Sequence, residues 1–415
     1  MQAFHLWAMA TAATVAAACA LVGTLLVVRR MSLLGDAIGH AVLPGIAVAV
    51  LLGGRPGGPL VFAGAMAAAL LTVWLTRVLR SAAGLADDAG AGVAFTALFA
   101  LGIVIVSTAG ARRDLDPSCV LHGVLELVPF DTVAVAGLEL PRGLVSAAAA
   151  LAIVAVALAA TWKLQVFTAF DADAARAAGV PVAAVTGGLL AATALVTVAG
   201  FDVVGAVLVV ALLVVPAAAA ELLVRRLHHV ALVAVGLAVA GACAGYLAAW
   251  RWNASAAGTI AVALGIEYLV AAIVAPGDGI VARGLARCRY ALRVAREDVL
   301  AALWRAEEAA GAAGGGRAAG SRLATAWLLA TGRLERRDGR PSLTPRGRAE
   351  AEMVVRSHRL WEAWLGRQSD LPLDHLHPPA EFVEHHLGAA VRRRIEAEVG
   401  RGDGDPHGRE IPPEA

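Results

Sequence analysis

Charge is scarce in the first two thirds of this 415-residue chain. Residues 1–277 hold 26 of its 68 Asp, Glu, Lys and Arg side chains, and residues 278–415 hold the other 42 in half the length. Hydrophobic residues make up 59% of the chain and charged residues 16%, against about 45–50% and about 25% in soluble domains. This composition excludes a fully soluble protein. The first part is predicted to lie in a membrane, and the second part is predicted to be a soluble domain.

Cysteine is also scarce. The four cysteines lie far apart and form no CxxC pair, which argues against a disulfide framework and against a cysteine-based zinc site. The net charge of +2 is too small to favour nucleic acid as the main partner. The chain also lacks the GxxxxGK[ST] motif that cradles nucleotide phosphates, so we expect it not to be an ATP-hydrolysing enzyme itself.

Long apolar runs recur at the length that spans a bilayer, about 17–25 residues. They predict about nine transmembrane helices, near 6–28, 38–53, 59–79, 91–109, 143–162, 183–200, 203–222, 229–249 and 256–275. Basic residues are modestly enriched in the loops of one side, which predicts an external amino terminus and a cytoplasmic carboxyl-terminal part. The expected fold is an all-α polytopic membrane protein followed by a mainly α soluble domain.

The carboxyl-terminal third has its own pattern. A helix is predicted over 278–308, followed by a Gly/Ala-rich connector that ends at 320. The stretch 333–347 predicts two short strands around Asp338 and Gly339, as in a wing-like hairpin. The other expected helices cover 322–332, 345–367 and 377–400. The predicted domains are a transmembrane domain over 1–277, a cytoplasmic helix with its linker over 278–320, and a metal-binding domain over 321–415.

The stretch MSLLGDAIGHAVLPG places an acid and an imidazole at membrane depth. Asp36 and His40 are four residues apart, so they share one face of a helix. Ionisable residues inside a bilayer are costly and are candidates for function. A carboxylate with an imidazole suits Mn²⁺, Zn²⁺ or Fe²⁺. The alternative interpretation is a polar pair that packs against other helices at a helix entrance.

Three ordered segments resemble one family. They are SLLGDAIGHAVLPGIAVAVLL, the loop AFDADAARAAGVP, and VGAVLVVALLVVPAAAAELL. Together they resemble the permease subunit of the ATP-binding-cassette importers that carry manganese, zinc or iron. The resemblance covers roughly residues 10–277. Without it, the loop would be interpreted as an ordinary connection between helices.

The resemblance implies a function and several partners. It implies a dimeric permease in a bacterial plasma membrane, an external metal-binding lipoprotein, and a separate cytoplasmic ATPase. Asp36 and His40 are then expected to contact the metal ion in the transport path. The ATPase is expected to dock on a short helix in the loop, with Asp171, Asp173, Ala174 and Gly179 as the candidate residues. A secondary transporter that needs no ATPase is a rival hypothesis, but the chain has no inverted repeat with charged broken helices to favour it.

Histidine and glutamate cluster near the carboxyl end. His358 and Glu362 are four residues apart on one predicted helix. On the next predicted helix, four residues fall on one face at relative positions 0, 4, 7 and 8: His377, Glu381, Glu384 and His385. Mixed oxygen and nitrogen ligands suit Mn²⁺, Fe²⁺ or Zn²⁺ better than Ca²⁺. The alternative is a solvated charged surface with incidental histidines.

The segment from about 295 to 415 resembles the diphtheria-toxin-repressor family of metal-dependent regulators, most strongly over 343–413. Glu381 stands where the iron branch has cysteine, so the manganese branch is the more similar one. The resemblance implies that Asp298, His358, Glu381, Glu384 and His385 bind the metal ion. The ligand expected three residues after Asp298 is Ala301 here. His358, Glu362 and His377 also match a second metal site of the iron branch.

The DNA-binding region departs from that family. The helix-turn-helix segment is replaced by a shortened Gly/Ala-rich stretch without polar side chains that would read bases, so DNA is not an expected partner. We therefore expect a domain that senses cytoplasmic metal, with manganese favoured over zinc and iron, and that regulates transport. Two alternatives are a degenerate fusion that only stabilises the dimer and a membrane-anchored transcriptional regulator.

Overall fold

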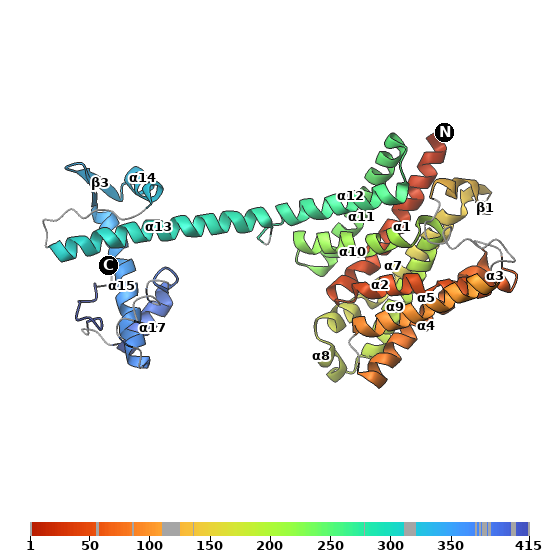
Figure 1. The fold of residues 1–415 in the computed structure, drawn as a ribbon, viewed down its shortest axis with the longest axis horizontal. Helices are drawn as coiled ribbons and strands as arrows, with labels where there is room; N and C mark the ends of the chain where they lie inside the picture. Colours follow the sequence, from red (N-terminus) through yellow and green to blue (C-terminus); the bar gives the residue numbers. More distant parts are fainter. Residues whose placement is uncertain are drawn as a thin grey trace. The chain divides into compact units, whose positions relative to one another are not determined.

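Apolar helices make up most of the first of two compact units into which the chain divides, residues 1–282 and 283–415 (Figure 1). The structure is a computed structural model. It describes residues 2–54, 58–84, 87–109, 125–135, 137–277, 279–310, 321–369, 372, 375, 380, 383–399 and 404–413.

Eight helices within these ranges are long and apolar enough to span a membrane. They are α1 (Gln2–Val28), α4 (Pro59–Ala83), α5 (Asp87–Ala109), α7 (Arg142–Phe170), α9 (Val182–Val204), α10 (Ala206–Leu223), α11 (Leu227–Trp252) and α12 (Ala256–Val274).

The ninth expected span is not a single helix. The run over 38–53 is divided between α2 (Ser32–Ala41) and α3 (Leu43–Leu51), with the break at Val42. Pro44 lies in the first turn of α3, where its missing N–H costs no hydrogen bond, and it disfavours continuation of α2. The expectation of about nine spans is thus met by eight continuous helices among the described residues and by the broken pair α2–α3.

Two further boundaries differ from expectation. The break between α9 and α10 falls at Gly205, with a φ of 81°, and not at residues 200–202. An unexpected hairpin of β1 (Thr132–Val135) and β2 (Leu138–Pro141) follows the short helix η2 (Leu125–Phe130). Gly137 supplies the positive φ that its turn requires. The membrane unit is thus mainly helical with one small hairpin.

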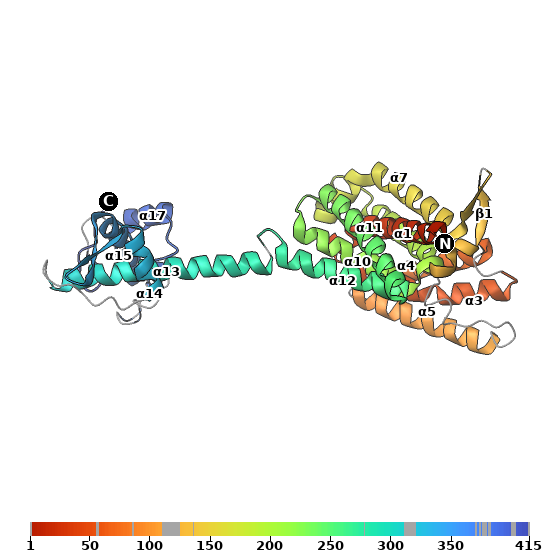
Figure 2. The ribbon, with the colours of Figure 1, turned by 90° about the horizontal axis from the view of Figure 1, so that it is seen from above.

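Small residues let the central helices approach closely. Helix α1 packs against α7, α9, α10 and α11 (Figure 2). A Cβ atom added to Gly23 of α1 would lie 1.8 Å from the Leu213 carbonyl oxygen of α10. One added to Gly45 of α3 would lie 2.0 Å from the Gly64 carbonyl oxygen of α4. Backbone contact of this kind is how membrane helices gain packing energy without a hydrophobic driving force.

The second unit contains the expected elements with one correction. They are α13 (Ile280–Ala310), α14 (Arg322–Ala330), β3 (Leu334–Arg337), β4 (Arg340–Leu343), α15 (Pro345–Gln368) and α17 (Ala389–Val399). The predicted hairpin is confirmed, and its turn has φ values of 52° at Asp338 and 77° at Gly339. The predicted helix over 377–400 was wrong in extent, because residues 384–388 form a turn and a short connection before α17 begins.

Apolar side chains of α13 anchor the second unit. Val299, Leu300 and Leu303 are almost fully buried against α14 and the hairpin. Helix α15 begins at Thr344, whose hydroxyl accepts a hydrogen bond from the Gly347 N–H at 3.2 Å. This arrangement sets α13 and α15 beside each other, with their polar residues available for a site.

Candidate metal sites

The first candidate site lies on the broken helix α2. Ala37, Ile38 and Ala41 are at most 2% exposed, so α2 is enclosed by other helices. Helix α2 contacts α4, α5, α9 and α10. Non-helical backbone at membrane depth is tolerated where protein or a water-filled path surrounds it, and broken helices often carry transport sites.

His40 lies at the end of α2 against aromatic rings of α5. Its ring centroid is 6.1 Å from that of Phe95 and 5.7 Å from that of Phe99. Asp36 lies one helical turn earlier on α2, and its side chain is outside the described part of the structure. The backbone therefore places both residues on one face of an enclosed helix.

The loop between α7 and α9 forms the short helix α8 (Ala172–Ala177). The Asp171 carboxylate caps it by accepting hydrogen bonds from the N–H groups of Asp173 at 3.1 Å and Ala174 at 2.8 Å. Gly179, with a φ of 82°, ends the helical turn. Asp171, Asp173, Ala174 and Gly179 are all exposed, whereas Ala175 is fully buried. The buried Ala175 thus packs α8 against the helix bundle, and the exposed residues of this loop form a small surface.

A polar cluster that the sequence did not reveal lies beside this loop. The Arg29 guanidinium, just after α1, donates to the Gln165 side-chain oxygen at 2.7 Å and to the Thr168 hydroxyl at 2.7 Å. It also donates to the Gln165 carbonyl and to the Thr186 hydroxyl, both at 3.1 Å. One side chain therefore joins the end of α1 to the helices on both sides of α8. In the sequence Arg29 is only one of the basic residues in the loops near the helix ends.

The second candidate site lies between α13, α15 and the turn at 384–386. Ligand atoms of Asp298, Glu384 and His385 all lie within 4.8 Å of one another. Glu384 is 5% exposed and His385 is 6% exposed. The Asp298 carboxylate is exposed, so the group lies at the edge of the buried region. Two carboxylates and an imidazole at this spacing form a donor set that suits Mn²⁺, Fe²⁺ or Zn²⁺.

His358 of α15 joins this group from the other side. Its Nδ1 lies 2.6 Å from Glu384 Oε2, and its Nε2 lies 3.1 Å from Glu362 Oε1. Burial lowers the pKa of His358, but the hydrogen bonds and charges of Glu362 and Glu384 outweigh it and raise the pKa. Each ring nitrogen thus lies within hydrogen-bond distance of a carboxylate oxygen. A metal ion would bind this side chain through an unprotonated ring nitrogen.

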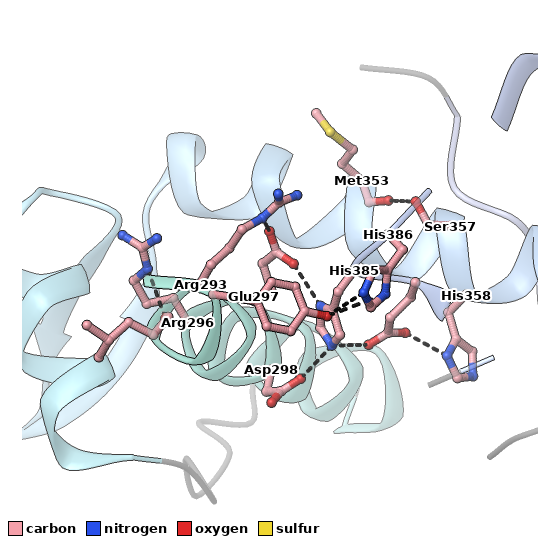
Figure 3. Close-up of polar contacts among 12 residues, drawn as sticks. Arg293, Arg296, Glu297, Asp298, Met353, Ser357, His358, His385 and His386 are labelled. Carbon is pink, nitrogen blue, oxygen red and sulfur yellow. Dashed lines mark hydrogen bonds and ion pairs between the residues drawn. The ribbon is translucent and has the colours of Figure 1, made fainter. Parts of the chain in front are cut away.

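The orientation of His385 is set by Glu297, a residue that sequence patterns missed. Its Nδ1 lies 2.7 Å from Glu297 Oε2, while its Nε2 lies 3.1 Å from Asp298 Oδ1 and 3.6 Å from Glu384 Oε1 (Figure 3). A carboxylate that accepts from one imidazole nitrogen directs the other toward a metal. No spacing rule links positions 297 and 385, because they meet only through the fold.

Three further positions belong to the expected metal site, and only Ala301 among them lies in the described part of the chain. His377 and Glu381 lie outside the described residues, so their places as ligands stay predictions. Ala301 is fully buried against Val354 and Val355. A methyl group thus lies at the position where the related regulators are expected to have a further ligand.

The membrane unit as a whole, eight apolar spans with a broken and enclosed polar helix, fits the class of multi-pass membrane transport proteins. Residues 1–275 match the family model "ABC 3 transport family", and the chain belongs to that family. Residues 344–413 match the model "Iron dependent repressor, metal binding and dimerisation domain". The expected permease family and the fused repressor-like domain are thereby confirmed.

Two related proteins are described as membrane proteins of metal transport systems. The manganese transport system membrane protein MntD of Bacillus subtilis is 39% identical over 285 residues, which cover 68% of this chain and 96% of MntD. The zinc transport system membrane protein TroD of Treponema pallidum is 35% identical over 66% of this chain and 75% of its own. The solved structure of PsaBC from Streptococcus pneumoniae in complex with Fab matches with a TM-score of 0.57 and 26% identity, over 69% of this chain and 95% of that one.

We predict that Glu297→Gln weakens Mn²⁺ binding by about 10- to 100-fold, because the loss of an orienting carboxylate behind a histidine ligand has this effect. The amide keeps the size of the side chain and removes its charge. Isothermal titration calorimetry of the purified full-length chain measures the change. The matched control is Glu335→Gln, which removes an exposed partner of Arg337 on β3. Equal affinity of both variants would show that Glu297 does not support a metal ligand.

Proposed function

We propose that this chain is the permease subunit of an ATP-driven importer of divalent transition-metal ions, with manganese favoured over zinc and iron. The observation that carries the proposal is α2, an enclosed half-helix with an acid and an imidazole one turn apart. A doubly charged ion enters a low-dielectric path only if ligands replace its water, and Asp36 and His40 offer an oxygen and a nitrogen for this.

The proposed complex has several partners. The chain pairs with a second permease copy in a bacterial plasma membrane, receives the ion from an external metal-binding lipoprotein, and depends on a separate cytoplasmic ATPase. The sequence supports this division of labour, because no phosphate-binding motif is present. The amino terminus faces outward and the carboxyl-terminal domain is cytoplasmic. The permease domain ends near 277 and the linker near 320, before the repressor-like domain.

The exposed helix α8 is the proposed docking surface for the ATPase. The Arg29 cluster then provides a route for its movements, since α7 and α9 lead into and out of α8 and Arg29 bonds to both. Arg29 is separated from the first residue of α2 by only two residues. Movement of α8 is thus transmitted to the helix that carries Asp36 and His40.

The carboxyl-terminal domain is proposed to sense cytoplasmic metal and to restrain transport when the ion is abundant. Asp298, His358, Glu384 and His385 are the described residues that would hold the sensed ion, and Glu362, Glu381 and His377 complete the proposed set. Transcriptional regulation is less well supported. Helix α14 offers few polar side chains, and the guanidinium carbons of Arg296 and Arg333 cover its Trp327 ring at 4.0 Å and 5.1 Å.

We predict that Asp36→Ala and His40→Ala each abolish metal uptake and leave assembly in the membrane intact. Each variant removes one of the two ligands that replace water around the ion. Uptake of radioactive manganese and zinc by cells that express the complete importer tests this. Glu221→Gln and His228→Ala, which change an exposed acid and an exposed histidine, are the matched controls. Normal uptake in both Asp36 and His40 variants would remove α2 from the transport path.

We predict that Arg29→Gln uncouples the importer. Charge-assisted hydrogen bonds contribute about 1.5–3 kcal/mol each, so the loss of several should slow uptake by about tenfold or more. ATP hydrolysis by the complete importer in proteoliposomes should continue. The neighbouring exposed Arg30, changed to Gln, is the control. Parallel loss of uptake and hydrolysis would instead indicate that Arg29 only maintains the fold or the docking surface.

We predict that His385→Ala relieves restraint by metal. Uptake by cells preloaded with manganese should fall in the wild type and stay high in the variant, because the variant lacks a central ligand of the sensing site. Initial uptake rates before and after preloading measure this, and His407→Ala, which changes an exposed histidine, is the control. The same fall in both variants would reduce the domain to a structural role.

A further inference from the structure

The first half of α13 is a basic amphipathic helix. Its Tyr290 hydroxyl lies 2.8 Å from His386 Nε2, and its apolar side chains lie on another face. Every residue from 283 to 293 is exposed. At about 100° per residue, four side chains fall within about 60° of one another on the helix: Val281, Leu285, Cys288 and Leu292. Val281, Leu285 and Leu292 are 59%, 49% and 48% exposed. An apolar stripe of about three turns therefore faces outward.

Positive charge covers the rest of this helix. Arg289 flanks one side of the stripe, Arg287 flanks the other, and Arg283 lies on the opposite face. No acidic residue occurs between 279 and 296. This charge pattern argues against a second copy as the occupant of the stripe, since two such helices would bring their arginines together without carboxylates to offset them.

The position of the helix favours a lipid surface. Helix α12, the last candidate span, ends at Val274, and α13 begins at Ile280 after a turn at Gly277 with a φ of 91°. Basic amphipathic helices next to a membrane span bind bilayers that contain anionic lipids, with the apolar face in the interface and the arginines near the phosphates. Five residues separate the ends of the two helices, so α13 begins close to the bilayer surface.

We infer that residues 280–293 of α13 bind the surface of a membrane that contains anionic phospholipid. Val281, Leu285, Cys288 and Leu292 enter the interface, and Arg283, Arg287 and Arg289 contact the headgroups. The same helix carries Glu297 and Asp298 one to two turns later. Lipid binding and metal binding therefore act on one element, and the inference holds for any transported ion.

The native Cys288 provides the probe. Cys19, Cys119 and Cys243 are replaced by alanine, and the full-length chain is labelled at Cys288 with bimane in liposomes that contain phosphatidylglycerol. We expect blue-shifted emission that lipids brominated on their acyl chains quench. A second chain with Cys288→Ser and Ala286→Cys carries the label on the opposite, exposed face. We expect water-like emission there, and unchanged calorimetric binding of Mn²⁺ confirms that both chains are folded.

Lipid charge and the arginines are varied in turn. In phosphatidylcholine alone, and in the triple variant Arg283→Gln, Arg287→Gln, Arg289→Gln, the blue shift at position 288 should be lost. Equal emission at positions 286 and 288, or a blue shift at 288 that ignores lipid charge, would overturn the inference. Two results together would assign the stripe to a second copy instead. They are a disulfide between two Cys288 residues under oxidation, and blue-shifted emission that brominated lipid does not quench.

Discussion

A buried charge needs a counter-charge or a ligand, and this constraint shapes both units of the protein. Glu384 is buried and lies within 4 Å of His358, His385 and Arg305. A buried carboxylate without such partners would cost several kcal/mol. Arg305 and the two histidines supply this compensation, and a divalent cation would supply it as well. The same electrostatic need that stabilises the turn at 384–386 therefore makes it a place for metal.

The membrane unit meets the constraint in another way. Its spans contain few ionisable residues, and Asp36 and His40 lie on a helix that is broken after Ala41 and enclosed by α4, α5, α9 and α10. Close packing through Gly23 and Gly45 leaves little freedom for these helices to shift singly. In the proposed mechanism a movement at α8 would therefore be passed on through whole helices, and Arg29 bonds to two of them, α7 and α9.

Patterns of hydrophobic length and turn chemistry predicted most of the fold. The eight spans, the hairpin at Asp338–Gly339 and α15 follow from local sequence. A bilayer requires a continuous run of apolar residues, and a tight turn requires residues that adopt a positive φ. The break at Val42 and the hairpin β1–β2 were missed although Pro44 and Gly137 are local signals for them, because the prediction followed the length of apolar runs. The turn at 384–388 was missed because its residues continue the helical spacing of the preceding segment. The candidate ligands came from spacing and resemblance. Glu297 and its partner His385 are 88 positions apart, and Arg29 and Gln165 are 136 positions apart, so no local pattern predicts these contacts.

Ala301 stands where the resemblance to metal-dependent regulators implies a further metal ligand. Its methyl group is packed against Val354 and Val355, so no rearrangement of side chains turns this position into a ligand. The described oxygen and nitrogen donors instead converge around His385 and Glu384, with His358 facing Glu384 through one nitrogen and Glu362 through the other. A site with fewer carboxylates holds a divalent ion less tightly, because each one removed takes away a full negative charge from the ion's surroundings. Weaker binding would suit the proposed sensing role, because the domain would then release its ion when the supply falls.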